Sequence, residues 1–222
     1  MEDKGKDIIN PPVEIYQFRV WIKKISPMVW RRLLVRNDTS VAALHHILQI
    51  VMHWECNYLH QFKIQGRTYG ISYEGGVGFR DNPHQIYLNQ FQFRINECFD
   101  YEYNFYAEWQ LEIRLEQHCF LNPKKFYPRC IGGRGKAPSE DIAGAIAFMQ
   151  QREENSGWRT NEKLLKLLKR YQADKVDTED FQEKLQELIS WANPHRFNRR
   201  AVNHTLKNLQ QYTPQGGYLY EY

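Results

Sequence analysis

The N-terminal part of the chain constrains the fold most, because two segments of alternating polarity precede one amphipathic segment. Residues 13–25 alternate apolar and polar side chains with one slip in phase, and residues 29–35 repeat the pattern after a Ser-Pro turn. Such alternation predicts a β-hairpin. Residues 41–54 follow the sequence NDTS, which is typical of a helix N-cap, and their apolar residues at 44, 47, 48, 51 and 52 fit one helix face.

The later segments complete an α+β prediction, a β-rich N-terminal domain with an embedded helix and then a helical C-terminal part. Short strands are expected at 60–64 and 67–71, and longer ones at 91–105 and 108–116. The hairpin–helix–strand start is similar to a ubiquitin-like β-grasp. Helices are expected at 141–151, 161–171, 178–191 and 198–212. The resulting units are a flexible lead-in (1–12), an α+β core (13–145), a helical part (146–212) and a tail (213–222).

Composition excludes several classes of protein. A hydrophobic content of 42% in 222 residues suffices for a buried core. No run of eighteen apolar residues and no apolar signal segment is present, so we expect no membrane partner. Four cysteines without a C-x-x-C pair predict free thiols and a cytoplasmic location.

Several separated motifs carry a family resemblance. The segment ISPMVWRRLLVRNDTSVAALHHILQIVMHW, then YLHQF, is similar to the opening of the plasmid pRiA4b ORF-three-like family. FDYEYNF, YPRCIGGRGKAPSEDIAG and NPHRFNRRAVN resemble its later motifs in the same order. The resemblance implies a largely uncharacterised protein of plasmids and transposons, some members of which carry the label of transposon passenger. His45, His60 and Cys130 match family positions, whereas His53 stands where the family has glycine.

The chain also departs from the family after the tyrosine-rich segment. Where the family has aspartate, glycine, aspartate and histidine, this sequence has Asn104, Tyr106, Ala107 and Leu111. Phe105 and Trp109 of that motif remain. The replaced residues are the best candidates for polar chemistry in the family, so their loss argues that this copy lacks any activity that depends on them.

A candidate polar cluster nevertheless comprises His45, His60, Trp109, Cys130, Glu140 and Asp141. Zinc requires three or four converging ligands. On a helix His46 points about 100° away from His45, and His60 follows the helix, so we expect the histidines to pack in a polar corner of the core. The sequence therefore predicts no metal, no cofactor and no catalytic residue.

Two functional interpretations of residues in this cluster compete with a purely structural one. Cys130 could act as a nucleophile beside a histidine, but a semi-buried thiol is favoured because nothing nearby lowers its pKa. Glu140 and Asp141 could bind a cation, yet they equally suit the start of the helix at 141–151, where carboxylates complement the dipole.

Basic residues give the last candidate. The whole net charge of +4 lies between Trp158 and Lys207, where 11 Lys and Arg face 7 Asp and Glu. Arg196, Arg199, Arg200 and Lys207 form a candidate nucleic-acid-binding cluster, with a solvated helix face as the alternative. Arg31 and Arg32 must lie on opposite faces of their strand, so they cannot hold one ligand together.

These observations favour a non-enzymatic accessory or interaction protein of a mobile genetic element, whose partner is an unknown protein or nucleic acid. A weak nucleic-acid-binding module and a cryptic metal-dependent or cysteine hydrolase are the alternatives. The sequence leaves the oligomeric state open. Trp30 and Trp54 are predicted to be structural, between the hairpin and the helix.

Overall fold

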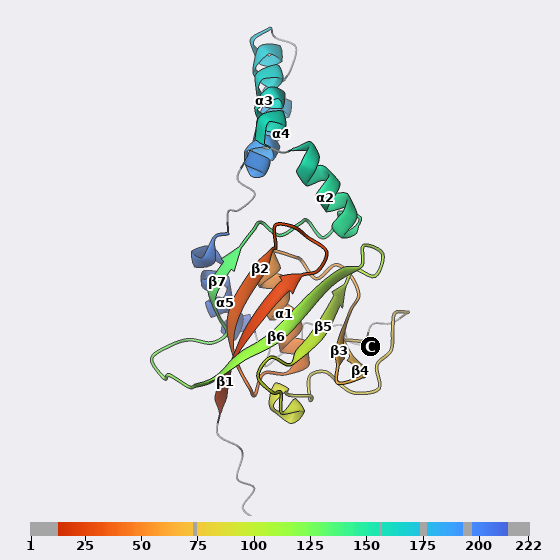
Figure 1. The fold of residues 1–222 in the computed structure, drawn as a ribbon, viewed down its shortest axis with the longest axis vertical. Coiled ribbons are helices and arrows are strands. Elements are labelled where there is room, and N and C mark those ends of the chain that lie inside the picture. Colours follow the sequence, from red (N-terminus) through yellow and green to blue (C-terminus); the bar gives the residue numbers. More distant parts are fainter. Residues whose placement is uncertain (1–12, 73–74, 156, 174–176, 193–196, 213–222) are drawn as a thin grey trace, which may run out of the picture.

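A seven-stranded antiparallel sheet forms the body of the protein in the computed structural model, with α1 and α5 on one face and a helical hairpin projecting from one end (Figure 1). The structure describes residues 13–72, 75–155, 157–173, 177–192 and 197–212. The strands are β1 (Glu14–Ile22), β2 (Trp30–Arg36), β3 (His60–Ile64), β4 (Arg67–Tyr69), β5 (Cys98–Tyr103), β6 (Trp109–Phe120) and β7 (Arg129–Arg134). The helices are α1 (Val41–Met52), α2 (Gly144–Glu154), α3 (Gly157–Gln172), α4 (Thr178–Ala192) and α5 (Arg199–Tyr212), with a 3-10 turn η1 (Leu88–Phe91).

The predicted hairpin is confirmed and lies within the sheet, whose order is β4-β3-β5-β6-β1-β2-β7. Phe18 of β1 faces Leu33 of β2 on one side and Leu115 of β6 on the other. The slip in phase along β1 coincides with a shift of register between Gln17 and Phe18. The unpaired residue of this bulge is Glu116 of β6, and Tyr16, Phe18, Val20 and Ile22 of β1 stay in the core.

Helix α1 begins and ends where local chemistry requires it. The Ser40 hydroxyl oxygen accepts a hydrogen bond from the Ala43 backbone N–H at 3.1 Å, as an N-cap does. The helix ends at His53, whose φ of 58° lies in the left-handed region. Glycine adopts that conformation most easily, so a histidine at this position is unusual.

Three expectations about local structure were wrong. Residues 91–95 form no strand: Phe91 ends η1, and its ring stacks on that of Phe93 at 5.3 Å within the core. The expected strands left out the segment around residue 130, which contains β7, paired with β2. The helix expected at 141–151 starts instead at Gly144, where φ is 83° and a Cβ atom would collide with the Ala107 carbonyl oxygen.

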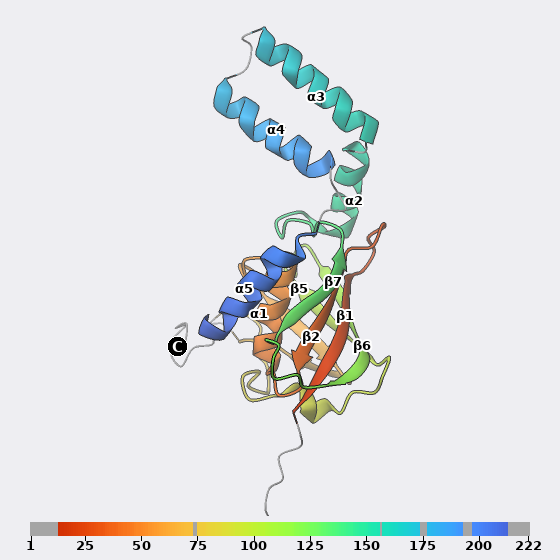
Figure 2. The same ribbon diagram turned by 90° about the vertical axis from the view of Figure 1, so that its left-hand side faces the viewer.

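The C-terminal helices do not form one body. Figure 2 shows α3 and α4 as an antiparallel pair that extends away from the sheet, whereas α5 returns to lie beside α1 and β7. Val202 and Leu206 of α5 are buried in the core. The predicted α+β class with a helical C-terminal part is therefore confirmed, while the β-grasp detail stays a prediction. The lead-in and the tail lie outside the described residues.

The two tryptophans occupy different environments. Trp54 is buried and stacks on Tyr103 with ring centroids 5.0 Å apart, as expected of a structural residue. Trp30 is half-buried on the opposite face of the sheet, between the guanidinium groups of Arg19 and Arg32. Its expected place between hairpin and helix was wrong, because the neighbouring Arg31 takes the inward position of the alternation.

We predict that Trp54→Ala lowers the free energy of unfolding by about 3–5 kcal/mol, because it removes a buried indole and leaves a cavity. Trp30→Ala is the matched control, and its loss should be clearly smaller since that side chain is only half-buried. Urea denaturation monitored by circular dichroism measures both. Equal losses would contradict this assignment of the core.

Candidate functional site

Two stacked histidines form the centre of a buried polar cluster. His45 of α1 and His60 of β3 lie with ring centroids 3.6 Å apart and planes 12° from parallel. The Nδ1 atom of His45 is 2.8 Å from the Tyr101 hydroxyl, and the Ile71 backbone N–H donates to Nε2 of His60 at 3.4 Å. Among the described residues, His45 Nε2 and His60 Nδ1 have no hydrogen-bond partner.

Burial keeps both imidazoles neutral. It lowers the pKa of His60 to about 3, with a smaller effect from His46. Burial likewise holds the pKa of His45 well below its usual value, and the neighbouring His60 and His46 lower it further. Neutral imidazoles can stack without charge repulsion, and the one lone pair of His60 is on Nε2, where it accepts from the Ile71 N–H.

Gln49 connects this pair to the turn that follows α1. Its Nε2 donates to the Tyr101 hydroxyl oxygen at 2.8 Å, and its Oε1 accepts from the Cys56 backbone N–H at 3.0 Å. The Cys56 thiol consequently lies 3.8 Å from Nδ1 of His46. The expected separation of His45 from His46 does not keep them apart: their ring centroids are 5.0 Å from each other.

Glu140 is a second centre of the cluster. Its carboxylate is buried and accepts from the Glu55 backbone N–H at 2.9 Å, from Asn57 Nδ2 at 2.7 Å and from the Tyr103 hydroxyl at 2.7 Å. Burial and the hydrogen bond to Glu140 raise the pKa of Tyr103, so the phenol stays a donor. The Glu140 carbonyl oxygen accepts from Trp109 Nε1 at 3.2 Å.

The structure brings most of the predicted cluster together. His45 and His60 lie beside Tyr101 and Tyr103, and Tyr103 links them to Glu140 and Trp109. Asp141 lies at the edge, where its carboxylate accepts from the Tyr58 hydroxyl at 2.7 Å. Because α2 starts only at residue 144, neither carboxylate lies in a first helical turn.

Cys130 is the member that does not belong to this cluster. It lies on the edge strand β7, and three strands separate β7 from β5. Its backbone N–H donates to Asn203 Oδ1 at 2.8 Å, and its thiol donates to the Gly132 carbonyl at 3.2 Å. Burial raises the pKa of the thiol, which opposes a nucleophilic role.

Sequence reasoning missed Gln49, Tyr101 and Tyr103. The alternation of β5 places both tyrosines on its helix-covered face, which is a signal that could have been read. Gln49 gave no such signal, because a polar residue in an apolar stripe is interpretable only once its partners are known.

Most of the residues that replace the family motif are buried and have structural contacts. Asn104 is buried, donates from Nδ2 to the Glu140 carbonyl at 2.9 Å and accepts from the Ala107 backbone N–H at 3.2 Å. Ala107 and Leu111 are buried, whereas Tyr106 is 90% exposed. Position 104 therefore belongs to the same network as Glu140.

The candidate basic cluster is divided. Arg199 is exposed but its Nη1 donates to the Ile131 carbonyl at 2.8 Å, which ties α5 to β7. Arg200 and Lys207 are exposed, and Arg196 lies outside the described residues. Arg31 and Arg32 follow the predicted alternation: Arg31 is buried, and Arg32 pairs with Glu116 on the other face at 2.6 Å.

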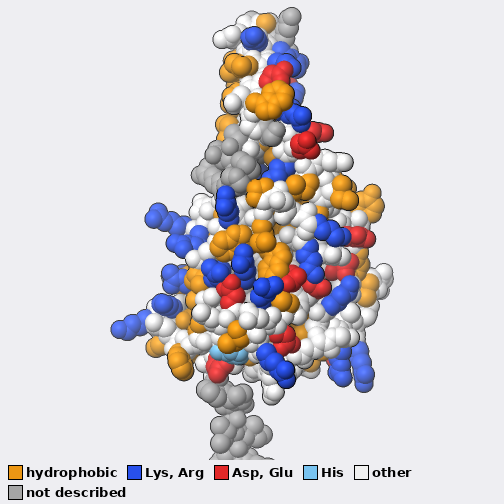
Figure 3. All heavy atoms as spheres, viewed as in Figure 1, with side chains coloured by type: hydrophobic (Ala, Val, Ile, Leu, Met, Phe, Trp, Pro, Cys, Tyr) orange, Lys and Arg blue, Asp and Glu red, His pale blue; other side chains and the backbone are white. Residues whose placement is uncertain are grey.

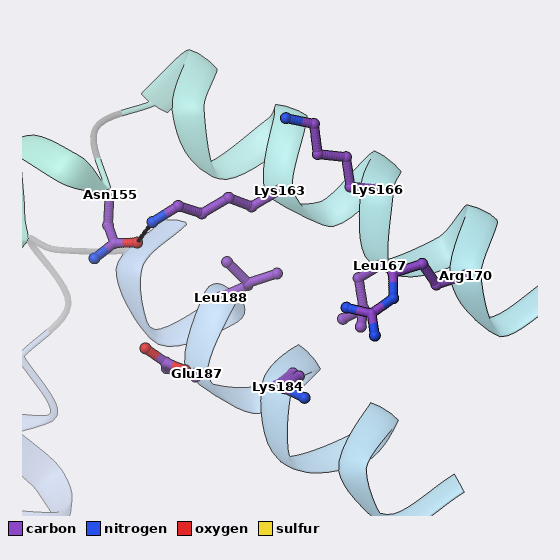
Figure 4. A pocket seen from close by; sticks show the side chains of 8 residues that line it. All are labelled: Asn155, Lys163, Lys166, Leu167, Arg170, Lys184, Glu187 and Leu188. Carbon is purple, nitrogen blue, oxygen red and sulfur yellow. Dashed lines mark hydrogen bonds between the residues drawn. The ribbon is translucent and has the colours of Figure 1, made fainter. Parts of the chain in front are cut away.

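A different surface stands out on the projecting hairpin of α3 and α4. Figure 3 shows hydrophobic and basic side chains side by side on this part of the molecule. Trp158 is 67% and Leu165 58% exposed, while Leu167 is buried against α4. A groove of about 290 Å³ between the two helices is drawn in Figure 4 and is lined by Asn155, Lys163, Lys166, Leu167, Arg170, Lys184, Glu187 and Leu188.

The fold and the cluster define an α+β protein that joins an antiparallel sheet, with a buried histidine–tyrosine–glutamate network, to a projecting helical hairpin. The model of the family described as plasmid pRiA4b ORF-3-like protein matches residues 14–199, so the chain belongs to that family. A crystal structure titled as protein of unknown function MM3350 from Methanosarcina mazei Go1 is similar, with 26% identity and a TM-score of 0.60. The similarity covers 86% of this chain and 97% of that one. No curated protein matches significantly. None of the described helices is long and apolar enough to cross a membrane.

We predict that Glu140→Gln lowers the free energy of unfolding by about 2 kcal/mol. The amide offers one acceptor oxygen where three donors converge, so a buried donor loses its partner. The matched control Asp141→Asn changes a neighbouring exposed carboxylate and should cost less than about 0.5 kcal/mol. Thermal or urea unfolding measures the stability of both variants. A similar small loss in both would show that the Glu140 network is not stabilising.

Proposed function

We propose that this protein is a non-enzymatic interaction protein of a plasmid or transposon, and that the hairpin of α3 and α4 is its partner-binding arm. The observation that carries the proposal is the exposure of Trp158 and Leu165 on an arm that extends from the sheet. The partner that fits this arm is a protein segment with acidic residues beside aromatic or aliphatic ones.

The apolar part of the arm supports a protein partner. Trp158, Leu165 and Leu168 fall on one side of α3 at a spacing of seven and three residues, and all three are exposed. The buried Leu167 lies on the side that faces α4. Apolar side chains gathered on an exposed helix face mark interaction sites, and tryptophan often dominates their binding energy.

The cations that line the groove between α3 and α4 support an acidic partner. Lys163, Lys166 and Arg170 of α3 and Lys184 of α4 line the groove, where Glu187 is the acidic lining residue (Figure 4). Lys166 pairs with Glu162 at 2.7 Å on a solvent-exposed helix surface. Exposed pairs of this kind contribute little, so their cations can exchange one carboxylate for another.

The other functions have less support. A cysteine hydrolase would require an activated thiol, whereas the Cys130 thiol is buried and donates to a backbone carbonyl. Nucleic-acid binding by α5 would rest mainly on Arg200 and Lys207, because the guanidinium of Arg199 already holds β7. Two phosphate contacts would give only weak binding that salt reduces further.

The test is selection of peptides from a random displayed library on the full-length protein, followed by measurement of their affinity. We expect the selected peptides to be acidic and to contain an aromatic or aliphatic anchor. The double variant Trp158→Ser, Leu165→Ser should bind them at least about tenfold more weakly, which corresponds to about 1.4 kcal/mol.

The matched control is the double variant Tyr106→Ser, Phe120→Ser, which removes two aromatic rings that are even more exposed at other places and should bind like the wild type. Peptides without acidic residues, or equal affinity for the arm variant, would contradict the proposal. Light scattering that shows a dimer lost in the arm variant would instead assign the face to a second copy. Tight duplex-DNA binding abolished by Lys166→Glu, Arg170→Glu would assign it to nucleic acid.

A further inference from the structure

Three side chains that could ligate a metal ion converge at the surface next to the buried histidine pair. One ligand atom each of His45, His46 and Cys56 lies within 4.8 Å of the other two, and His46 Nδ1 is 3.8 Å from the Cys56 sulfur. A tetrahedral zinc ion requires ligand atoms roughly 3.3–3.6 Å apart. His46 and Cys56 are exposed, so small rotations of their side chains can close the remaining gap.

The buried member of the group has an unused nitrogen. His45 is fully buried, its Nδ1 is taken by the Tyr101 hydroxyl, and its Nε2 has no partner among the described residues. A buried polar atom without a partner is costly, so its presence calls for an explanation. A metal ion on Nε2 satisfies it, since neutral imidazole is a ligand through that lone pair.

The surroundings supply the support that metal-bound histidines usually have. In the tautomer with the proton on Nδ1 of His45, that N–H donates to the Tyr101 oxygen and Nε2 is free for a metal. Gln49 donates to the same oxygen and accepts from the Cys56 backbone N–H. The buried Gln49 side chain thus holds both His45 and Cys56 in place. The third ligand, His46, follows His45 directly in α1.

We propose that His45, His46 and Cys56 form a zinc-binding site with its fourth position open to solvent. This inference is independent of the partner-binding arm. On binding, the Cys56 S–H bond is replaced by an S–Zn bond, and the proton passes to solvent. The buried carboxylate of Glu140, which bonds the backbone N–H of the preceding residue, places negative charge near the ion.

The proposal replaces the expectation of no metal. That expectation rested on the directions of His45 and His46 on the helix and on the place of His60 after it. The left-handed conformation of His53 and of Cys56 (φ 58° and 63°) turns the chain back toward the helix, which brings the thiol beside His46.

Isothermal titration of the chelator-treated, reduced full-length protein with zinc chloride tests the site. We expect one zinc per chain with a dissociation constant in the micromolar range or tighter. Cys56→Ser and His46→Ala should each weaken binding at least about tenfold. Cobalt(II) should give a thiolate charge-transfer absorption that is lost in Cys56→Ser.

Cys98→Ser is the matched control, since Cys98 is also an exposed free cysteine, and it should bind zinc like the wild type. His46 and Cys56 are exposed, so circular dichroism of their variants should match the wild type, and either variant suffices should the other fail to fold. No stoichiometric binding by the wild type, or wild-type affinity in both Cys56→Ser and His46→Ala, would overturn the proposal. A cobalt spectrum without a thiolate band would do so as well.

Discussion

The buried carboxylate of Glu140 is the interaction on which the arrangement of the site depends. It accepts from the turn after α1, through Glu55 and Asn57, and from β5, through Tyr103. Its backbone carbonyl accepts from Asn104 and Trp109 of the β5–β6 hairpin. A buried charge is tolerated only when several donors surround it, so these segments have to meet at one place. The turn that carries Cys56 is positioned in consequence.

Next to Glu140, the core is built from aromatic rings that carry polar atoms. Tyr101 and Tyr103 lie nearly parallel, with Trp54 stacked on Tyr103 and His45 stacked on His60. Rings of this kind bury large areas, while their hydroxyl and N–H groups find hydrogen-bond partners. This is how one face of an antiparallel sheet combines apolar packing with a polar network, and how a histidine nitrogen comes to be held under the protein surface.

The projecting hairpin is stabilised differently, by packing between its own two helices. Its base is held through α2: Arg152 of α2 donates to the Pro27 carbonyl at 3.0 Å, and Trp191 of α4 packs on Phe148 of α2. Farther out, α3 and α4 have mainly each other to pack against, so one apolar face of each is covered and the rest remains exposed. Helix α5 then returns to the sheet through Val202 and Leu206. The hairpin of α3 and α4 is therefore packed mainly within itself and contributes little to the core over the sheet.

The sequence by itself determined whatever depends on neighbouring residues. The alternation of residues 13–25 and 29–35 determined the hairpin and the opposite directions of Arg31 and Arg32, and Ser40 with the apolar spacing determined α1. Periodicity alone also determined α3, α4 and α5. The tertiary structure decided which of these elements meet. It paired the glycine-rich β7 with β2, where Gly133 leaves room for the Phe197 ring, and so separated Cys130 from the histidines. It also brought Cys56 to His46, and it gathered the turn after α1 and the β5–β6 hairpin at Glu140. Local periodicity reports which face of an element is apolar, but hydrogen bonds between residues 37 or 85 positions apart depend on how the whole chain packs.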